Sequence, residues 1–166
     1  MERMKTLLLM RHAKSSWKEP GLSDHDRPLN RRGEQAAPRM AKWLEDQALS
    51  PDIIICSTAL RAKSTAGLVA DSLSDDVDAV PFSQLYLSGE ESYLEVMRTI
   101  DSEIATLLLV GHNPTMEHLT ACLTGSSEVF PTGAIAQVEC PIESWFQLRL
   151  DESNQLVQFC KPRDLD

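Results

Sequence analysis

The sequence predicts an α/β protein: a three-layer α/β/α sandwich with a mostly parallel sheet and antiparallel edge strands near the C-terminus. Up to Gly125, short apolar runs alternate with segments of helical periodicity. The strongest runs are continuous, as expected for strands that helices cover on both faces. Beyond Phe130 the pattern changes to closely spaced strands and turns, which favours antiparallel additions to the sheet.

Seven strands are expected along the chain. Four belong to the alternating part, at Thr6–Met10, Asp52–Cys56, Ala79–Phe82 and Thr106–Val110. Three more are expected near the C-terminus, at Ala134–Cys140, Trp145–Leu150 and Leu156–Cys160, with a turn signal at Asp151–Asn154 between the last two.

Four helices are expected between these strands. Asn30 is a suitable N-cap for the first helix, which contains Pro38 and stops at Ser50-Pro51. The others are expected to begin after a cap at Ser57 or Thr58, to cover Glu90–Asp101, and to start at Pro114 with Asn113 as the cap.

Length and composition restrict the class of protein. A chain of 166 residues fits a single domain, with residues 1–166 in one unit. The formal net charge of −9 argues against nucleic-acid binding. The four cysteines form no CxxC pair, so reduced thiols are expected and a zinc site is not.

The apolar run at the N-terminus, Leu7–Met10, is too short for a signal peptide or a membrane span. We therefore expect no membrane association and a cytoplasmic location. Nothing in the pattern indicates an obligate interface, so a monomer is expected.

Two apolar runs end in a histidine. Arg11-His12 follows the first strand, and Gly111-His112 follows the fourth. Ligands bind at the carboxyl ends of strands in open α/β sheets. Arginine can hold an anion with its planar fork, and a neutral imidazole can act as a nucleophile near pH 7. The alternatives are a charged pair that closes a strand and a structural histidine in a turn.

Two further cations are candidates for the same site. Arg61 lies in the first turn of the second helix, where a cation opposes the helix dipole unless an anion compensates it. Lys14 follows His12 closely enough to reach a bound phosphate. For both residues the alternative is an ordinary solvated side chain.

Five blocks of the sequence form a recognisable set: Arg11-His12-Ala13, Ser57–Ala62 with Thr65-Ala66, Gly111–Pro114, Pro28–Ala36 and Pro131–Ala134. Together they resemble the histidine phosphatase superfamily, which includes the cofactor-dependent phosphoglycerate mutases. The similarity covers Lys5 to Arg163. Most relatives have glycine at the position of Ala13, and alanine there resembles the SixA-type phosphohistidine phosphatase branch.

The resemblance implies a phosphoglycerate mutase-like fold without a sizeable cap insertion, and a phosphatase that needs no metal or cofactor. His12 would take the phosphoryl group and water would then hydrolyse the phosphohistidine enzyme. Arg11, Arg61 and His112 would surround the phosphoryl oxygens. Such a site supplies positioning and charge stabilisation, which phosphoryl transfer requires.

The sequence does not identify the residue that protonates the leaving group. Glu90 and Glu91 are candidates, although they also suit the start of a helix, and Asp24 and Asp26 are others. An imidazole leaving group can carry its own proton, whereas an alkyl phosphate needs a general acid. The missing assignment and the expected shallow site favour phosphohistidine on a protein as the substrate.

Two other functions remain at this point. One is a small-molecule phosphomonoesterase or a mutase of the same superfamily. The other, of a different class, is a module that binds phosphate without turning it over.

Overall fold

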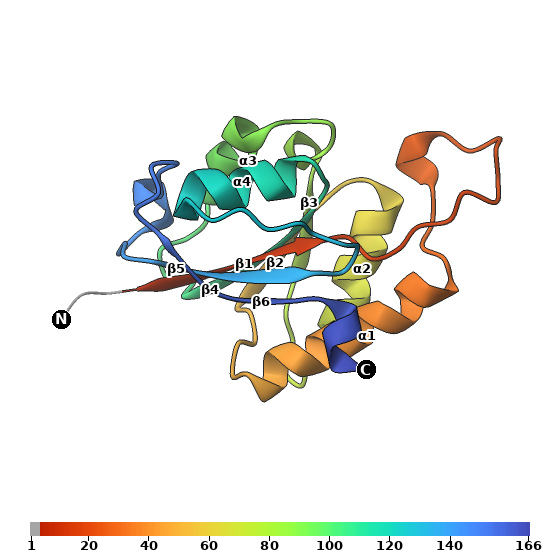
Figure 1. Cartoon of the computed structure of the whole chain (residues 1–166), viewed down its shortest axis with the longest axis horizontal. Coiled ribbons are helices and arrows are strands. Elements are labelled where there is room, and N and C mark those ends of the chain that lie inside the picture. The colour runs from red at the N-terminus through yellow and green to blue at the C-terminus, as the bar shows by residue number, and fades with distance from the viewer. Residues whose placement is uncertain (1–3) are drawn as a thin grey trace.

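A computed structural model of the chain describes residues 4–166 and contains a six-stranded sheet (Figure 1). Its order is β3-β2-β4-β1-β5-β6, with parallel pairing from β3 to β1 and antiparallel pairing of β5 and β6. The expected α/β fold with antiparallel edge strands is confirmed. The strands are β1 (Lys5–Arg11), β2 (Ile53–Ser57), β3 (Ala79–Phe82), β4 (Thr106–Gly111), β5 (Ile135–Cys140) and β6 (Gln155–Cys160).

Helices cover both faces of the sheet. Figure 1 shows α1 (Arg31–Asp46) and α2 (Leu60–Ser72) on one side, and α3 (Glu90–Arg98) and α4 (Thr115–Thr124) on the other. Successive side chains of a strand point to opposite faces. Leu7 and Leu9 therefore belong to the core beneath α3 and α4, while Leu8 and Met10 belong to the core against α1 and α2. This two-sided burial explains the continuous apolar runs.

Only one of the expected helix caps has the predicted geometry. The Asn30 side chain accepts a hydrogen bond from the Gly33 amide at 2.9 Å, and α1 continues through Pro38. The cap residue of α2 is instead Ala59, whose amide donates to Ser57 Oγ. The cap residue of α4 is Pro114.

Asn113 does not cap α4, because its side chain is used elsewhere. Its Nδ2 donates to Glu117 and to the Phe130 carbonyl, at 2.9 and 3.1 Å. The amide therefore ties the start of α4 to the segment before β5.

The strand expected at Trp145–Leu150 is wrong. Trp145–Gln147 forms a short 3₁₀ helix, because the Ser144 and Gln147 side chains satisfy each other's backbone amides in a capping box. Trp145 and Leu148 are both fully buried, at the three-residue spacing of this turn. Their apolar character therefore reflects burial in a loop that packs under α3. It does not reflect the pairing of a strand.

Within residues 4–166, no helix combines the length and the apolar character that crossing a bilayer requires.

Candidate active site

The sheet register brings the two histidines together. Arg11 of β1 lies opposite Gly111 of β4 in the parallel ladder, so the next residue of each strand reaches the same point. The His12 amide donates to the Gly111 carbonyl at 3.0 Å, and the ring centroids of His12 and His112 are 5.2 Å apart. The predicted meeting of both strand ends is thus observed.

His12 is held as a neutral imidazole with one free nitrogen. Its Nδ1 lies 2.7 Å from the Ala13 carbonyl oxygen and must donate to it, which leaves the lone pair on Nε2. Burial first, and then the nearby arginines, lower the pKa of His12 to about 4, against the raising effect of the Ala13 hydrogen bond. Only 7% of the residue is exposed. A neutral ring with a free Nε2 is the form that can act as a nucleophile.

His112 is positioned from two sides. Its Nε2 lies 2.8 Å from Ser57 Oγ at the end of β2, and its amide donates to the Tyr93 hydroxyl at 3.1 Å. That hydroxyl in turn donates to the Leu85 carbonyl. Burial first, and then the neighbouring His12 and Arg61, lower the pKa of His112 to about 3. His112 is therefore also neutral near pH 7.

Gly111 is required by this arrangement. A Cβ atom at this position would lie 2.6 Å from the Tyr93 hydroxyl oxygen. The absence of a side chain lets the hydroxyl approach the backbone and receive the His112 amide.

Arg11 is half-buried and lines the site. Its Nη1 donates to the Phe130 carbonyl at 2.9 Å, while its Nε is buried without a hydrogen-bond partner among residues 4–166. Burial lowers the pKa of Arg11, and the Glu117 carboxylate opposes that shift. A guanidinium in the wall of a cavity is suited to an anion.

Arg61 is buried beside the same cavity. It donates to the Asp24 carbonyl oxygen at 2.7 Å and to Asp24 Oδ2 at 3.0 Å. The Thr65 hydroxyl accepts from the Ala13 amide and donates to the Arg61 carbonyl. The first turns of α2 are therefore tied to the backbone beside His12.

A third arginine of the site, Arg27, was not predicted from the sequence. It is 8% exposed, and its Nη1 donates to Asp24 Oδ1 at 3.0 Å while its Nη2 donates to Ser15 Oγ. Its guanidinium carbon lies 3.2 Å from the ring centroid of Trp17. The signal was its place directly before Pro28, the first residue of a block already identified.

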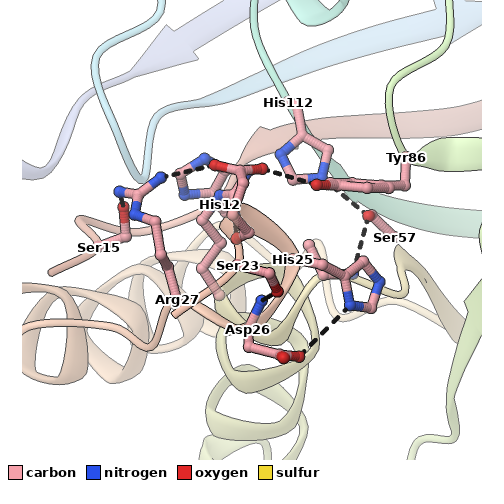
Figure 2. A network of polar contacts seen from close by, with 12 residues as sticks. His12, Ser15, Ser23, His25, Asp26, Arg27, Ser57, Tyr86 and His112 are labelled. Atoms are coloured by element: carbon pink, nitrogen blue, oxygen red, sulfur yellow. Dashed lines mark hydrogen bonds and ion pairs between the residues drawn. The ribbon is translucent and has the colours of Figure 1, made fainter. Parts of the chain in front are cut away.

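Tyr86 was missed as well, because it lies in an irregular segment without periodicity. Its hydroxyl donates to Asp24 Oδ2 at 2.7 Å, and its ring packs edge-on against His112 and His25 (Figure 2). The Nε2 of His25 lies 2.9 Å from the Thr58 hydroxyl, which fixes the 3₁₀ turn Asp24–Asp26 over the start of α2.

Among the candidate acids, Asp24 is the carboxylate that enters the site. It accepts hydrogen bonds from Tyr86, Arg61 and Arg27, and these lower its pKa to about 2. Asp26 contacts His25 instead, at 3.7 Å. Glu90 and Glu91 form the first turn of α3 and do not line the cavity.

The cavity around these groups has a volume of about 710 Å³. Its walls include Arg11, His12, Arg61, His112 and the exposed Lys14. The side chains of Trp17 and Leu87 stand at its rim, 77% and 82% exposed. Across the described part of the chain, no three His, Cys, Asp or Glu side chains cluster as metal ligands.

Comparisons with known proteins agree with this geometry. Residues 7–82 match the family model of the histidine phosphatase superfamily (branch 1). An uncharacterized protein of Mycobacterium leprae is 34% identical over 93% of this chain and 100% of its own length.

Solved structures of histidine phosphatases are also similar to this chain. A SixA protein from Agrobacterium tumefaciens is 30% identical, with a TM-score of 0.80 over 95% of this chain and 98% of that one. A protein histidine phosphatase SixA complexed with tungstate is 27% identical, with a TM-score of 0.80 over 97% and 99% of the two chains. A mycobacterial glucosyl-3-phosphoglycerate phosphatase, 14% identical at a TM-score of 0.67, shares the fold.

Proposed function

This chain belongs to the histidine phosphatase superfamily, and on that premise we propose that it removes the phosphoryl group from phosphohistidine on a protein. His12 takes the group in a first step and water releases it in a second. Neither step uses a metal or a cofactor. The observation that carries the proposal is a neutral His12 with a free Nε2, surrounded by the guanidinium groups of Arg11, Arg27 and Arg61.

In the first step, the Nε2 lone pair of His12 forms a bond to phosphorus. The P–N bond of the substrate breaks, and its electron pair stays on the leaving imidazole nitrogen. The second ring nitrogen of that imidazole already carries a proton, so the group leaves neutral. The arginines and His112 stabilise the charge on the phosphoryl oxygens during transfer.

In the second step, a water oxygen bonds to phosphorus and the bond to Nε2 breaks. The electron pair returns to His12, and the protons of the water leave with the phosphate. His12 is thereby restored in the neutral form from which it started.

Asp24 supports a P–N substrate over an alkyl phosphate. A carboxyl group with a pKa of about 2 is ionised at neutral pH and has no proton to give to an alkoxide. The same carboxylate can accept a hydrogen bond from the N–H of a leaving imidazole. It therefore favours the protonated form of phosphohistidine, in which the P–N bond breaks readily.

One further observation supports a protein substrate, and a second supports an oxyanion at the arginines. Trp17 and Leu87 stand exposed at the rim, where a protein surface can contact them. Tungstate, which a SixA structure contains, is a tetrahedral dianion like phosphate. The same oxyanion chemistry suits the arginines of this cavity.

The experiment compares a histidine-phosphorylated peptide, the same peptide phosphorylated on serine, and an alkyl phosphate. We expect phosphate release from phosphohistidine, unchanged by EDTA, and loss of at least about a thousandfold in His12→Ala. Preference for the alkyl phosphate would support a small-molecule phosphomonoesterase instead. Binding of all three without turnover would support a phosphate-binding module.

A further inference from the structure

A second cavity adjoins the catalytic one. It has a volume of about 360 Å³ and shares Lys14 and Thr132 with the catalytic cavity as common walls. Its other walls come from α1, from Pro131 and from the C-terminal segment 161–166. That segment contains the 3₁₀ helix η4 (Pro162–Leu165), which lies beside α1 in Figure 1.

The charge of this second cavity is opposite to that of the molecule. It is lined by five cations: Lys14, Arg32, Arg39, Lys161 and Arg163. Among the described residues its only carboxylate is Asp166, which pairs with Arg39 at 2.9 Å. The two cavities together are lined by eight of the chain's 16 Lys and Arg residues, although the net charge is −9.

The wall between the cavities is fixed by backbone contacts. The Lys14 carbonyl accepts from the Asn30 amide at 3.0 Å, and a Cβ atom at Gly33 would overlap that carbonyl. On the other side, the Gly133 amide donates to the Arg11 and His12 carbonyls, and a Cβ at Gly133 would lie 2.9 Å from Pro162. The backbone at Lys14 and Gly133, which separates the two cavities, is therefore held next to His12.

We propose that this second cavity binds the acidic segment that flanks the phosphohistidine of the substrate protein. The proposal rests on the proposed function and names the chemistry of its substrate. Arg32 and Arg163 are exposed, and neither side chain forms a hydrogen bond or ion pair within residues 4–166. Free guanidinium groups next to a phosphoryl site can form bidentate pairs with carboxylates. They also attract an acidic segment towards the phosphoryl site. Cations on three chain segments suit an extended peptide better than a single small anion.

The test compares two histidine-phosphorylated peptides of equal length, one flanked by Glu and one by Gln. We expect the wild-type protein to prefer the Glu peptide by roughly tenfold in kcat/KM, through KM. Arg32→Gln/Arg163→Gln removes that preference and leaves the Gln peptide unchanged. The matched control, Arg31→Gln/Arg149→Gln, removes two exposed cations that do not line the cavity and keeps the preference.

Two results would overturn the assignment: no preference for the Glu peptide in the wild-type protein, or equal losses of that preference in both double variants. Failure of the proposed function has a different signature, which is turnover of neither peptide. In that case, binding of an unphosphorylated hexaglutamate peptide tests whether the second cavity still binds an acidic segment. Binding by the wild-type protein that Arg32→Gln/Arg163→Gln abolishes supports the subsite, and equal or absent binding rejects it.

Discussion

The protonation state of two side chains governs the chemistry of this site. His12 and His112 are buried with their pKa values lowered to about 4 and about 3, from an ordinary value of 6.5. Both are therefore uncharged over a wide range of pH. An uncharged pair tolerates the neighbouring arginines and leaves His12 nucleophilic.

This burial predicts a loss of stability in acid. Between pH 6.5 and about 4 the unfolded chain binds more protons at these histidines than the folded one, so stability is present above that range and falls with pH. Each histidine accounts for about 2 kcal/mol at pH 5. Urea unfolding at pH 7 and pH 5 should show a smaller decrease in His112→Gln than in the wild-type protein. Equal decreases would show that His112 is not buried in its neutral form.

Asp24 is expected to weaken the binding of anions at the site. Its carboxylate occupies donors of Arg27 and Arg61, and a bound oxyanion competes for them. The side chain is 45% exposed, which screens the interaction. Asp24→Asn is expected to strengthen competitive inhibition by tungstate roughly threefold to tenfold. It should also lower the ratio of phosphohistidine to aryl phosphate turnover. Unchanged inhibition and an unchanged ratio would show that Asp24 contributes neither to anion affinity nor to substrate specificity.

At the scale of elements, the carboxyl ends of β1, β2 and β4 position the site. Gly111 at the end of β4 makes room for the Tyr93 hydroxyl that receives the His112 amide. Gly111→Ala would displace a fully buried tyrosine, and we expect a loss of about 2 kcal/mol of stability together with reduced activity.

Gly67→Ala is the matched control. Gly67 lies inside α2, where a Cβ atom would meet no other atom within 4 Å. Alanine is expected there to stabilise the protein by about 0.5–1 kcal/mol with activity unchanged. Thermal unfolding and kcat/KM measured on both variants check the pair. A Gly111→Ala protein as stable and active as Gly67→Ala would contradict the packing argument.

Elements were predictable where burial on both faces produced an unambiguous pattern. The ends of β1 and β4 differ from expectation by a single residue, since runs such as Leu107–Val110 leave one interpretation. The segment at Trp145 failed because fully buried side chains in a 3₁₀ turn are as apolar as those in a strand. Caps failed where Asn113 and Ser57 had competing partners that are distant in sequence.

Part of the site was predictable because its residues lie at the ends of predictable strands. Arg11, His12 and His112 lie at strand ends, and parallel pairing brings strand ends together. Arg61 follows from its helix start. Arg27 and Tyr86 lie on irregular segments, and only the tertiary packing of the turn Asp24–Asp26 against α2 places them beside His12. No local pattern in the sequence encodes that contact.

For the whole molecule, the distribution of charge matters more than its sum. An acidic protein of net charge −9 concentrates half of its Lys and Arg residues around two adjoining cavities. Attraction of an acidic phosphopeptide should therefore weaken as salt screens it. Raising salt from about 0.05 M to about 0.5 M is expected to lower kcat/KM for such a peptide several-fold. A neutral-flanked peptide should show a weaker dependence, and identical slopes would contradict a localised basic region.

The central claim is that the phosphoryl group passes through Nε2 of His12. The direct measurement is rapid alkaline quenching during turnover of a phosphohistidine peptide, followed by mass spectrometry of the digested protein. We predict one phosphoryl group on His12, attached at Nε2, because Nδ1 is engaged by the Ala13 carbonyl. A phosphoryl group on another residue, or turnover that leaves His12 unmodified within the first catalytic cycle, would contradict the account.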